Sequence, residues 1–99
     1  MVSLEQIVGF DWDDGNGRKS ADKHDVSQAD AESIFFGDPL IVAEDSKHSK
    51  EERRFHALGR TIQGRTLHVT FTLRENETLI RVISARDMNR RERQLYGQA

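Results

Sequence analysis

The chain has 99 residues, with no cysteine and one proline. A chain of this length is expected to form one domain over residues 1–99, with no room for a second domain. The lack of cysteine excludes a disulfide framework and any metal site built on thiolates. Charged residues make up 32% of the chain, but both signs are present and the apolar residues recur periodically. This combination argues against a disordered protein.

The net charge of −2 conceals an uneven distribution of charge. Residues 1–49 carry four basic and eleven acidic groups, a formal charge of −7, whereas residues 50–99 carry eleven basic and six acidic groups, a formal charge of +5. Ten of the eleven cations in the second half are arginines, whose planar guanidinium matches pairs of phosphate oxygens. The pattern indicates either two different partners or two halves whose solvated charges face each other.

The first half of the chain predicts one short strand and two helices. Residues 6–12 form the strand, and the Asp- and Gly-rich residues after it form a turn. A weak helix is expected over 17–23. A better one is expected over 27–36, because Ser27 supplies an N-cap and Gly37 an end signal.

The second half predicts strands at 40–44, 53–61, 65–74 and 78–86, followed by a terminal helix over 88–96. Consecutive strands joined by tight turns pair antiparallel. The chain is therefore expected to be an α+β protein, with an antiparallel β-sheet of about four strands and the helices packed against one side of it.

Three clusters of polar residues are candidates for catalysis or nucleic-acid binding. Each also has a structural reading, as a solvated helix end, an ion-paired strand edge or a set of buried ion pairs. A histidine can take and give a proton near neutral pH, and arginines can stabilise the charge that builds on a phosphate. A metal-independent ribonuclease needs these groups. The clusters are 23–25, 48–54, and the arginines between residues 81 and 93 together with Tyr96.

No cofactor, metal or membrane contact is expected. Phosphate-loop, dinucleotide-binding, EF-hand and HExxH motifs are absent from the sequence. A zinc site without cysteine would need histidine and carboxylate ligands, and no two of the four histidines have helical i,i+4 spacing. No apolar run approaches the length of a membrane span, and the first ten residues lack the features of a signal peptide. We therefore expect a cytoplasmic protein.

Short motifs stand in order along nearly the whole chain: Lys23-His24 with Val26-Ser27, His48-Ser49 with Glu51-Glu52-Arg53, Leu58-Gly59-Arg60-Thr61, and Arg81-Val82-Ile83-Ser84-Ala85-Arg86. In order and spacing these motifs resemble the BrnT family of ribonuclease toxins from bacterial toxin–antitoxin modules. The chain departs from the family pattern at Asp25, where glycine is usual, and at Phe71, where tyrosine is frequent.

The resemblance implies a fold similar to RelE-type toxins and RNA cleavage without metal or cofactor. It also implies neutralisation by a BrnA-like antitoxin of the ribbon-helix-helix class, in a hetero-oligomer that touches DNA only through the antitoxin. Two alternatives stay open. One is a non-catalytic module that binds an antitoxin and regulates an operon, and the other is a stand-alone RNA-binding domain.

Residue roles follow from this reading. We assign proton transfer to His48 or His24, with Glu52 as an alternative base or as the carboxylate that orients the histidine. Three arginines would stabilise the charged phosphate, and further residues would bind RNA. The predicted catalytic set is His24, His48, Glu52, Arg53, Arg81 and Arg86, and the predicted RNA-binding set is Lys23, Arg54, Arg91 and Tyr96.

Overall fold

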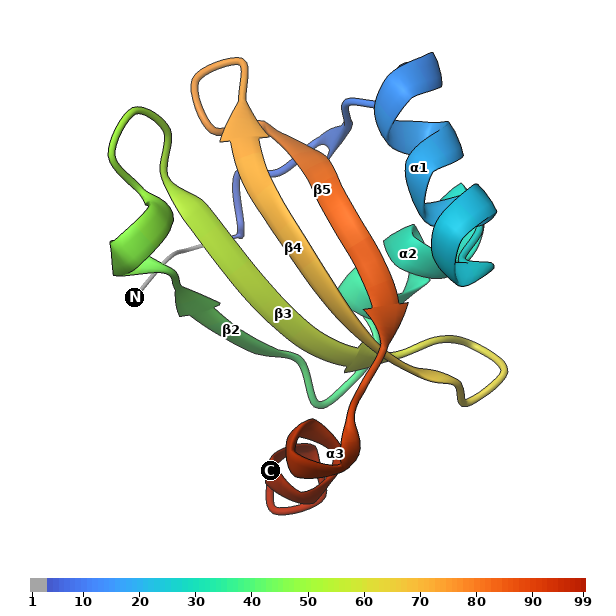
Figure 1. Ribbon diagram of the computed structural model, residues 1–99. Coiled ribbons are helices and arrows are strands. Elements are labelled where there is room, and N and C mark those ends of the chain that lie inside the picture. Colours follow the sequence, from blue (N-terminus) through green and yellow to red (C-terminus); the bar gives the residue numbers. More distant parts are fainter. Residues whose placement is uncertain (1–3) are drawn as a thin grey trace.

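The structure, a computed structural model, describes residues 4–99 except for the side chains of residues 19–23. Helices surround a five-stranded sheet with the strand order β1-β5-β4-β3-β2 (Figure 1). In chain order the elements are β1 Gly9–Phe10, α1 Asp14–His24, α2 Gln28–Ser33, the 3-10 turn η1 Ile34–Phe36, β2 Ile41–Glu44, the 3-10 turn η2 Ser46–His48, β3 Arg54–Arg60, β4 Thr66–Arg74, β5 Leu79–Asp87 and α3 Arg90–Tyr96.

The α+β class and the order of elements are confirmed, but the prediction of four antiparallel strands is wrong. β1 runs parallel to β5, with Gly9 opposite Leu79 and Phe10 opposite Ile80. The sheet is therefore mixed, although β2 to β5 pair antiparallel as expected. The sequence carries no signal for the pairing of β1 with β5, because these strands are far apart in the chain and no turn joins them.

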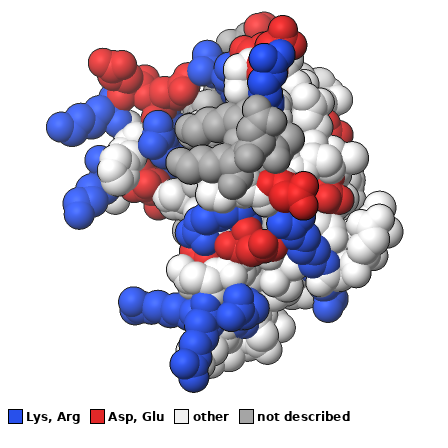
Figure 2. Space-filling view, turned by 45° about the vertical axis from the view of Figure 1, so that its right-hand side comes forward, with Lys and Arg blue, Asp and Glu red and all other residues white. Residues whose placement is uncertain are grey.

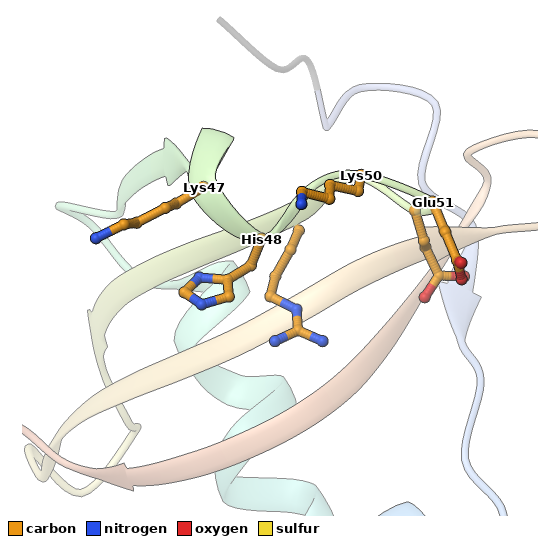
Figure 3. A pocket seen from close by; sticks show the side chains of 6 residues that line it. Lys47, His48, Lys50 and Glu51 are labelled. Carbon is orange, nitrogen blue, oxygen red and sulfur yellow. The ribbon is translucent and has the colours of Figure 1, made fainter.

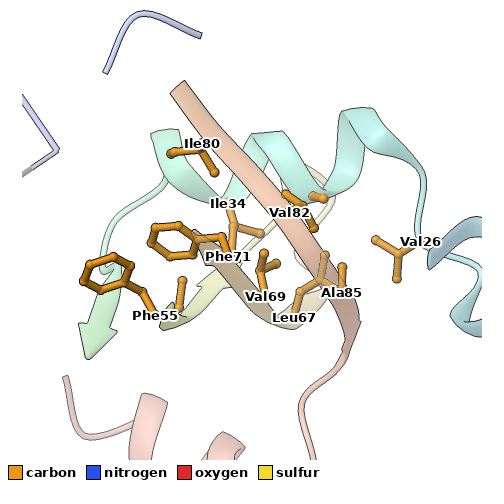
Figure 4. Packing of buried hydrophobic residues seen from close by; sticks show 11 residues of the cluster. Val26, Ile34, Phe55, Leu67, Val69, Phe71, Ile80, Val82 and Ala85 are labelled. Carbon is orange, nitrogen blue, oxygen red and sulfur yellow. The ribbon is translucent and has the colours of Figure 1, made fainter. Parts of the chain in front are cut away.

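The main hydrophobic core lies between the sheet and the segment formed by α2 and η1 (Figure 4). Leu67, Val69 and Phe71 alternate along β4 toward this side and are fully buried, as the spacing predicts. Phe55 stacks on Phe71 with a centroid separation of 5.4 Å. Asn16 fixes α1 to the sheet, because its Nδ2 donates to the carbonyl of Val82 at 3.0 Å.

The terminal helix α3 packs on the other face of the sheet, which corrects the expectation that all helices lie on one side. Leu58, Met88 and Tyr96 form a second buried cluster there. Leu58 follows Ala57, a main-core residue, and successive strand residues point to opposite faces. None of the helices within residues 4–99 is long and apolar enough to cross a bilayer.

Gly59 allows the close packing of β3 on η1, and replacing it should destabilise the fold. A Cβ at this position would lie 2.8 Å from the Cβ of Ile34 and 3.2 Å from its carbonyl oxygen. We expect Gly59→Ala to lower the free energy of unfolding by roughly 1–3 kcal/mol in urea titrations, because Ile34 is fully buried and has no room to move.

Gly9→Ala is the matched control. A Cβ there would meet its nearest neighbour, Leu79 Cδ2, at 3.5 Å, which is an ordinary contact. Its stability should stay within about 0.5 kcal/mol of the unmodified chain. Equal losses in the two variants would contradict the packing argument for Gly59.

Candidate active site

The sheet face opposite the core carries polar side chains from three neighbouring strands. The register places His56 of β3 opposite Thr70 of β4, and Thr70 opposite Ser84 of β5. Further along the strands, His68 of β4 lies opposite Arg86 of β5. Directly opposite residues of an antiparallel pair share one face, so these side chains lie side by side. The polar sheet face, as we call it, consists of Arg54, His56, His68, Thr70, Ser84 and Arg86.

Asp45 holds two histidines at the rim of the polar sheet face. Its Oδ2 accepts hydrogen bonds from His48 Nδ1 at 2.9 Å and from His56 Nε2 at 2.8 Å. An ionised carboxylate only accepts, so it fixes the ring proton of His48 on Nδ1. The Nε2 of neutral His48 is then unprotonated, on a side chain that is 62% exposed. This is the arrangement that a general base requires.

His56 completes this hydrogen-bonded chain on the buried side. Its Nδ1 lies 3.0 Å from the hydroxyl of Thr70. With its proton on Nε2 toward Asp45, the neutral ring accepts the Thr70 hydroxyl proton at Nδ1. The hydrogen bond with Thr70 fixes His56 on the sheet, and His56 in turn fixes Asp45.

The backbone of η2 also fixes Asp45. Its Oδ1 accepts the amide protons of Lys47 and His48, each at 3.2 Å. The hydrogen bonds from His56 and then from His48 hold the pKa of Asp45 far below its usual range. The carboxylate is therefore ionised wherever the protein is folded near neutral pH.

This lowered pKa predicts a pH-dependent contribution of Asp45 to stability. Because the pKa is lower in the folded than in the unfolded chain, the contribution is present above the unfolded value of 3.8 and is lost as the pH falls toward the folded value. We expect the free energy of unfolding of Asp45→Asn to be lower than that of the unmodified chain at about pH 7, and this difference to become smaller at about pH 3. Urea titrations at both pH values measure this difference in free energy, and a difference that does not change with pH would contradict the prediction.

His68 lies beside His56, with ring centroids 5.0 Å apart. Its Nδ1 is buried and has no hydrogen-bond partner among the described residues. Burial, followed by the positive charge of Arg86, lowers the pKa of His68. The ring is therefore neutral at physiological pH, which leaves the proton-transfer role to a more exposed histidine.

Arg86 is bound by a carboxylate from α3. Glu92 accepts from Arg86 Nη1 at 2.8 Å and from Nη2 at 2.9 Å, a bidentate ion pair. The same carboxylate caps its own helix, because Glu92 Oε1 accepts the amide proton of Asn89 at 2.9 Å. Arg86 thus joins α3 to the polar sheet face.

A hollow of about 490 Å³ opens beside His48 where the chain passes from η2 into β3 (Figure 3). Arg54 reaches it from the polar sheet face, since it lies two residues from His56 on β3. Lys47, Lys50 and Arg54 line it, and none of them forms an ion pair with a carboxylate among the described residues. The lining residues are Lys47, His48, Lys50, Glu51, Glu52 and Arg54.

Comparison with known proteins decides the family. Residues 12–92 match the family model described as the ribonuclease toxin, BrnT, of type II toxin-antitoxin systems. The chain belongs to the BrnT family. The crystal structure of the Brucella abortus ribonuclease toxin BrnT superposes with a TM-score of 0.61 and 21% identity, covering 84% of this chain and 99% of that one, which shows a shared fold. No curated protein sequence matches the chain.

The structure does not gather the predicted catalytic residues of this BrnT-family chain at one point. Glu52 lines the hollow, but its carboxylate pairs with Arg74 at 3.1 Å. Asp45, which the sequence analysis did not select, takes the orienting position instead. Arg53 pairs with Glu44 at 2.8 Å and is not one of the described residues that line the hollow.

Arg81 is engaged by two carboxylates of the β1–α1 connection. Its guanidinium lies 2.8 Å from Asp13 and 3.4 Å from Asp11. The hydrogen bond to Asp13 raises the pKa of Arg81. The backbone hydrogen bond from Asn16, followed by the hydrogen bond from Arg81, lowers the pKa of Asp13. The structural reading of this arginine, as a clamp between β5 and the N-terminal segment, fits these contacts.

His24 lies at the other end of the sheet from His48. Its carbonyl accepts from Arg65, and Arg65 pairs with Asp87 at the end of β5. The side chain of Lys23 lies outside the described residues. His48 belongs to η2, which precedes the start of β3. Asp87 is aligned with the far end of β3, because Asp87 pairs with Leu67 of β4 and Leu67 pairs with Gly59 of β3. The two predicted histidines therefore do not share a site.

Tyr96 and Arg91 both belong to α3 but differ in exposure. Tyr96 is 8% exposed, and its hydroxyl donates to the carbonyl of Pro39 at 2.6 Å. It is a packing residue with little surface for a base to stack on, so the RNA-binding role predicted for it is not supported. Arg91 is exposed. Figure 2 shows Lys and Arg side chains projecting together at the lower end of the molecule, where α3 lies.

The missed residues had weak signals in the sequence. Asp45 follows a strand and stands three residues before His48, a spacing typical of an Asx-type cap. His56 and His68 stand at alternating strand positions that point away from the core. Their proximity depends on strand register, which the sequence does not show.

Proposed function

We propose that this chain is a metal-independent ribonuclease toxin that cleaves RNA at the hollow beside His48, and that an antitoxin of the same module neutralises it. The observation that supports the proposal is the hydrogen bond from His48 Nδ1 to Asp45, which leaves Nε2 free beside unpaired cations. Membership of a ribonuclease toxin family makes RNA the substrate to test first.

The proposed reaction is attack of a ribose 2′-hydroxyl on its own 3′-phosphate. His48 Nε2 takes the hydroxyl proton, the new P–O bond closes a 2′,3′-cyclic phosphate, and the bond to the 5′-oxygen breaks. The leaving oxygen gains a proton from the imidazolium or from water. Asp45 stabilises the imidazolium, and Arg54 with Lys50 stabilises the charge on the phosphate oxygens.

We further propose that the antitoxin is BrnA-like and of the ribbon-helix-helix class. The assembly would then be a hetero-oligomer, because ribbon-helix-helix proteins are dimers and each subunit would recruit one toxin chain. A light-scattering mass that corresponds to one toxin with one antitoxin would contradict this assembly. The likeness to RelE-type toxins stays a prediction.

An RNA cleavage assay with the purified chain tests the catalytic proposal. We expect cleavage to continue unchanged in excess EDTA, with products that end in a 2′,3′-cyclic phosphate, because the proposed groups need no metal. Cleavage that EDTA abolishes and a divalent cation restores would contradict the mechanism.

The alternative is a non-catalytic module that binds the antitoxin and regulates an operon. One observation favours it: Arg53, Arg81 and Arg86 all form ion pairs with carboxylates, so none of the three is free for phosphate. Expression of the chain alone in bacteria separates the two proposals. Growth arrest with loss of RNA supports the ribonuclease, and harmless expression of folded protein supports the module.

A further inference from the structure

Three exposed apolar side chains lie near one another on the helix side of the sheet, away from the hollow beside His48. Val8 and Phe36 are each 81% exposed and Ile62 is 88% exposed. Phe36 stands between two hollows: it lines one of about 420 Å³ together with Ile62, and one of about 200 Å³ together with Val8. We call these three residues the Phe36 patch. Exposed apolar residues that gather beside hollows mark interaction surfaces.

Phe36 is connected to the core through a series of aromatic rings. It meets Phe10 edge-on at 6.4 Å, Phe10 packs on Phe35 at 5.7 Å, and Phe35 meets the buried Phe71 at 5.2 Å. This aromatic series runs from the sheet to the surface. A partner that covers Phe36 therefore extends an existing aromatic cluster, and an aromatic side chain of this kind is a typical anchor of an interface.

The charge around the Phe36 patch selects the kind of partner. Glu32 and Asp38 line the hollow shared with Ile62, against a single cation, Arg60. The half of the chain that supplies β1, α1 and α2 carries a formal charge of −7. Such a surface repels nucleic acid, and a second copy of this chain would bring like charges together. A basic amphipathic protein segment fits both features.

We infer that the Phe36 patch is the docking surface for the antitoxin. An amphipathic segment of the antitoxin inserts apolar side chains beside Phe36 and places lysines or arginines against Glu32 and Asp38. A toxin of a type II toxin-antitoxin system has an antitoxin as its partner. The inference rests on the antitoxin part of the proposed function and is independent of RNA cleavage.

Binding of purified variants to the antitoxin, taken as the small protein encoded beside this chain, tests the inference by calorimetry. We expect Phe36→Ser to weaken binding by roughly thirtyfold or more, as truncation of a buried aromatic anchor does, and Ile62→Ser to weaken it by roughly tenfold. Asp38→Asn should make the affinity less dependent on salt. Leu95→Ser is the matched control, because Leu95 is 55% exposed but lies on α3, and its affinity should not change.

Circular dichroism and RNA cleavage by each variant show whether the fold is intact. Unchanged affinity in both Phe36→Ser and Ile62→Ser would overturn the inference. It would also be overturned if the free chain self-associates in sedimentation velocity and Phe36→Ser abolishes this, because the occupant would then be a second copy. Absence of RNA cleavage by the unmodified chain, with antitoxin binding still sensitive to Phe36, would reject the catalytic proposal alone and support this inference.

Discussion

His48→Ala should lower the rate of RNA cleavage by about 100-fold or more while the melting temperature stays close to that of the unmodified chain. His48 is 62% exposed and lies on a short 3-10 turn, so its loss removes little packing. Its Nε2 is the proposed acceptor of the 2′-hydroxyl proton, so the substitution removes the proposed base. Cleavage of a defined RNA at saturating enzyme, with thermal unfolding of the same sample, measures both quantities.

His24→Ala is the control for this experiment, since the sequence analysis offered the two histidines as alternatives. His24 sits at the end of α1, where its carbonyl contacts Arg65. We expect its variant to cleave RNA at nearly the rate of the unmodified chain. The reverse result, with cleavage lost in His24→Ala and kept in His48→Ala, would move the proposed site to the opposite end of the sheet.

Arg54→Ala and Arg81→Ala should have opposite effects. Arg54 lines the hollow and pairs with no described carboxylate, so its loss should reduce cleavage by about 100-fold with little change in melting temperature. Arg81 is bound by Asp11 and Asp13, so its loss should leave cleavage nearly intact and lower the melting temperature by roughly a few degrees.

Charge-conserving variants distinguish the two roles further. Arg54→Lys keeps one positive charge but loses the second fork that a bidentate phosphate contact uses, so it should recover only part of the lost rate. Arg81→Lys should recover most of the stability, because a single ammonium can lie between the two carboxylates. If Arg81→Ala loses cleavage without a change in stability, the clamp interpretation is wrong and Arg81 belongs to the active site.

The sequence by itself determined the local elements of this protein. Alternation of apolar residues predicted β3, β4 and β5 to within one or two residues, because each strand buries one face against the same core. The cap at Ser27 and the turn at Gly64 were also readable, since Gly64 has a φ of 93° and Ser27 accepts the amide proton of Asp30. These features depend on neighbours in the chain.

Only the tertiary structure decided the parts that depend on distant residues. The parallel pairing of β1 with β5 joins the two ends of the chain, and the clamp from Asp13 to Arg81 spans the same distance. The site itself is of this kind, because Asp45 meets His56 only when β2 and β3 pair, and register rather than composition sets which side chains share a face. The sequence shows which charged residues are present, but the partner of each arginine depends on how the whole sheet folds.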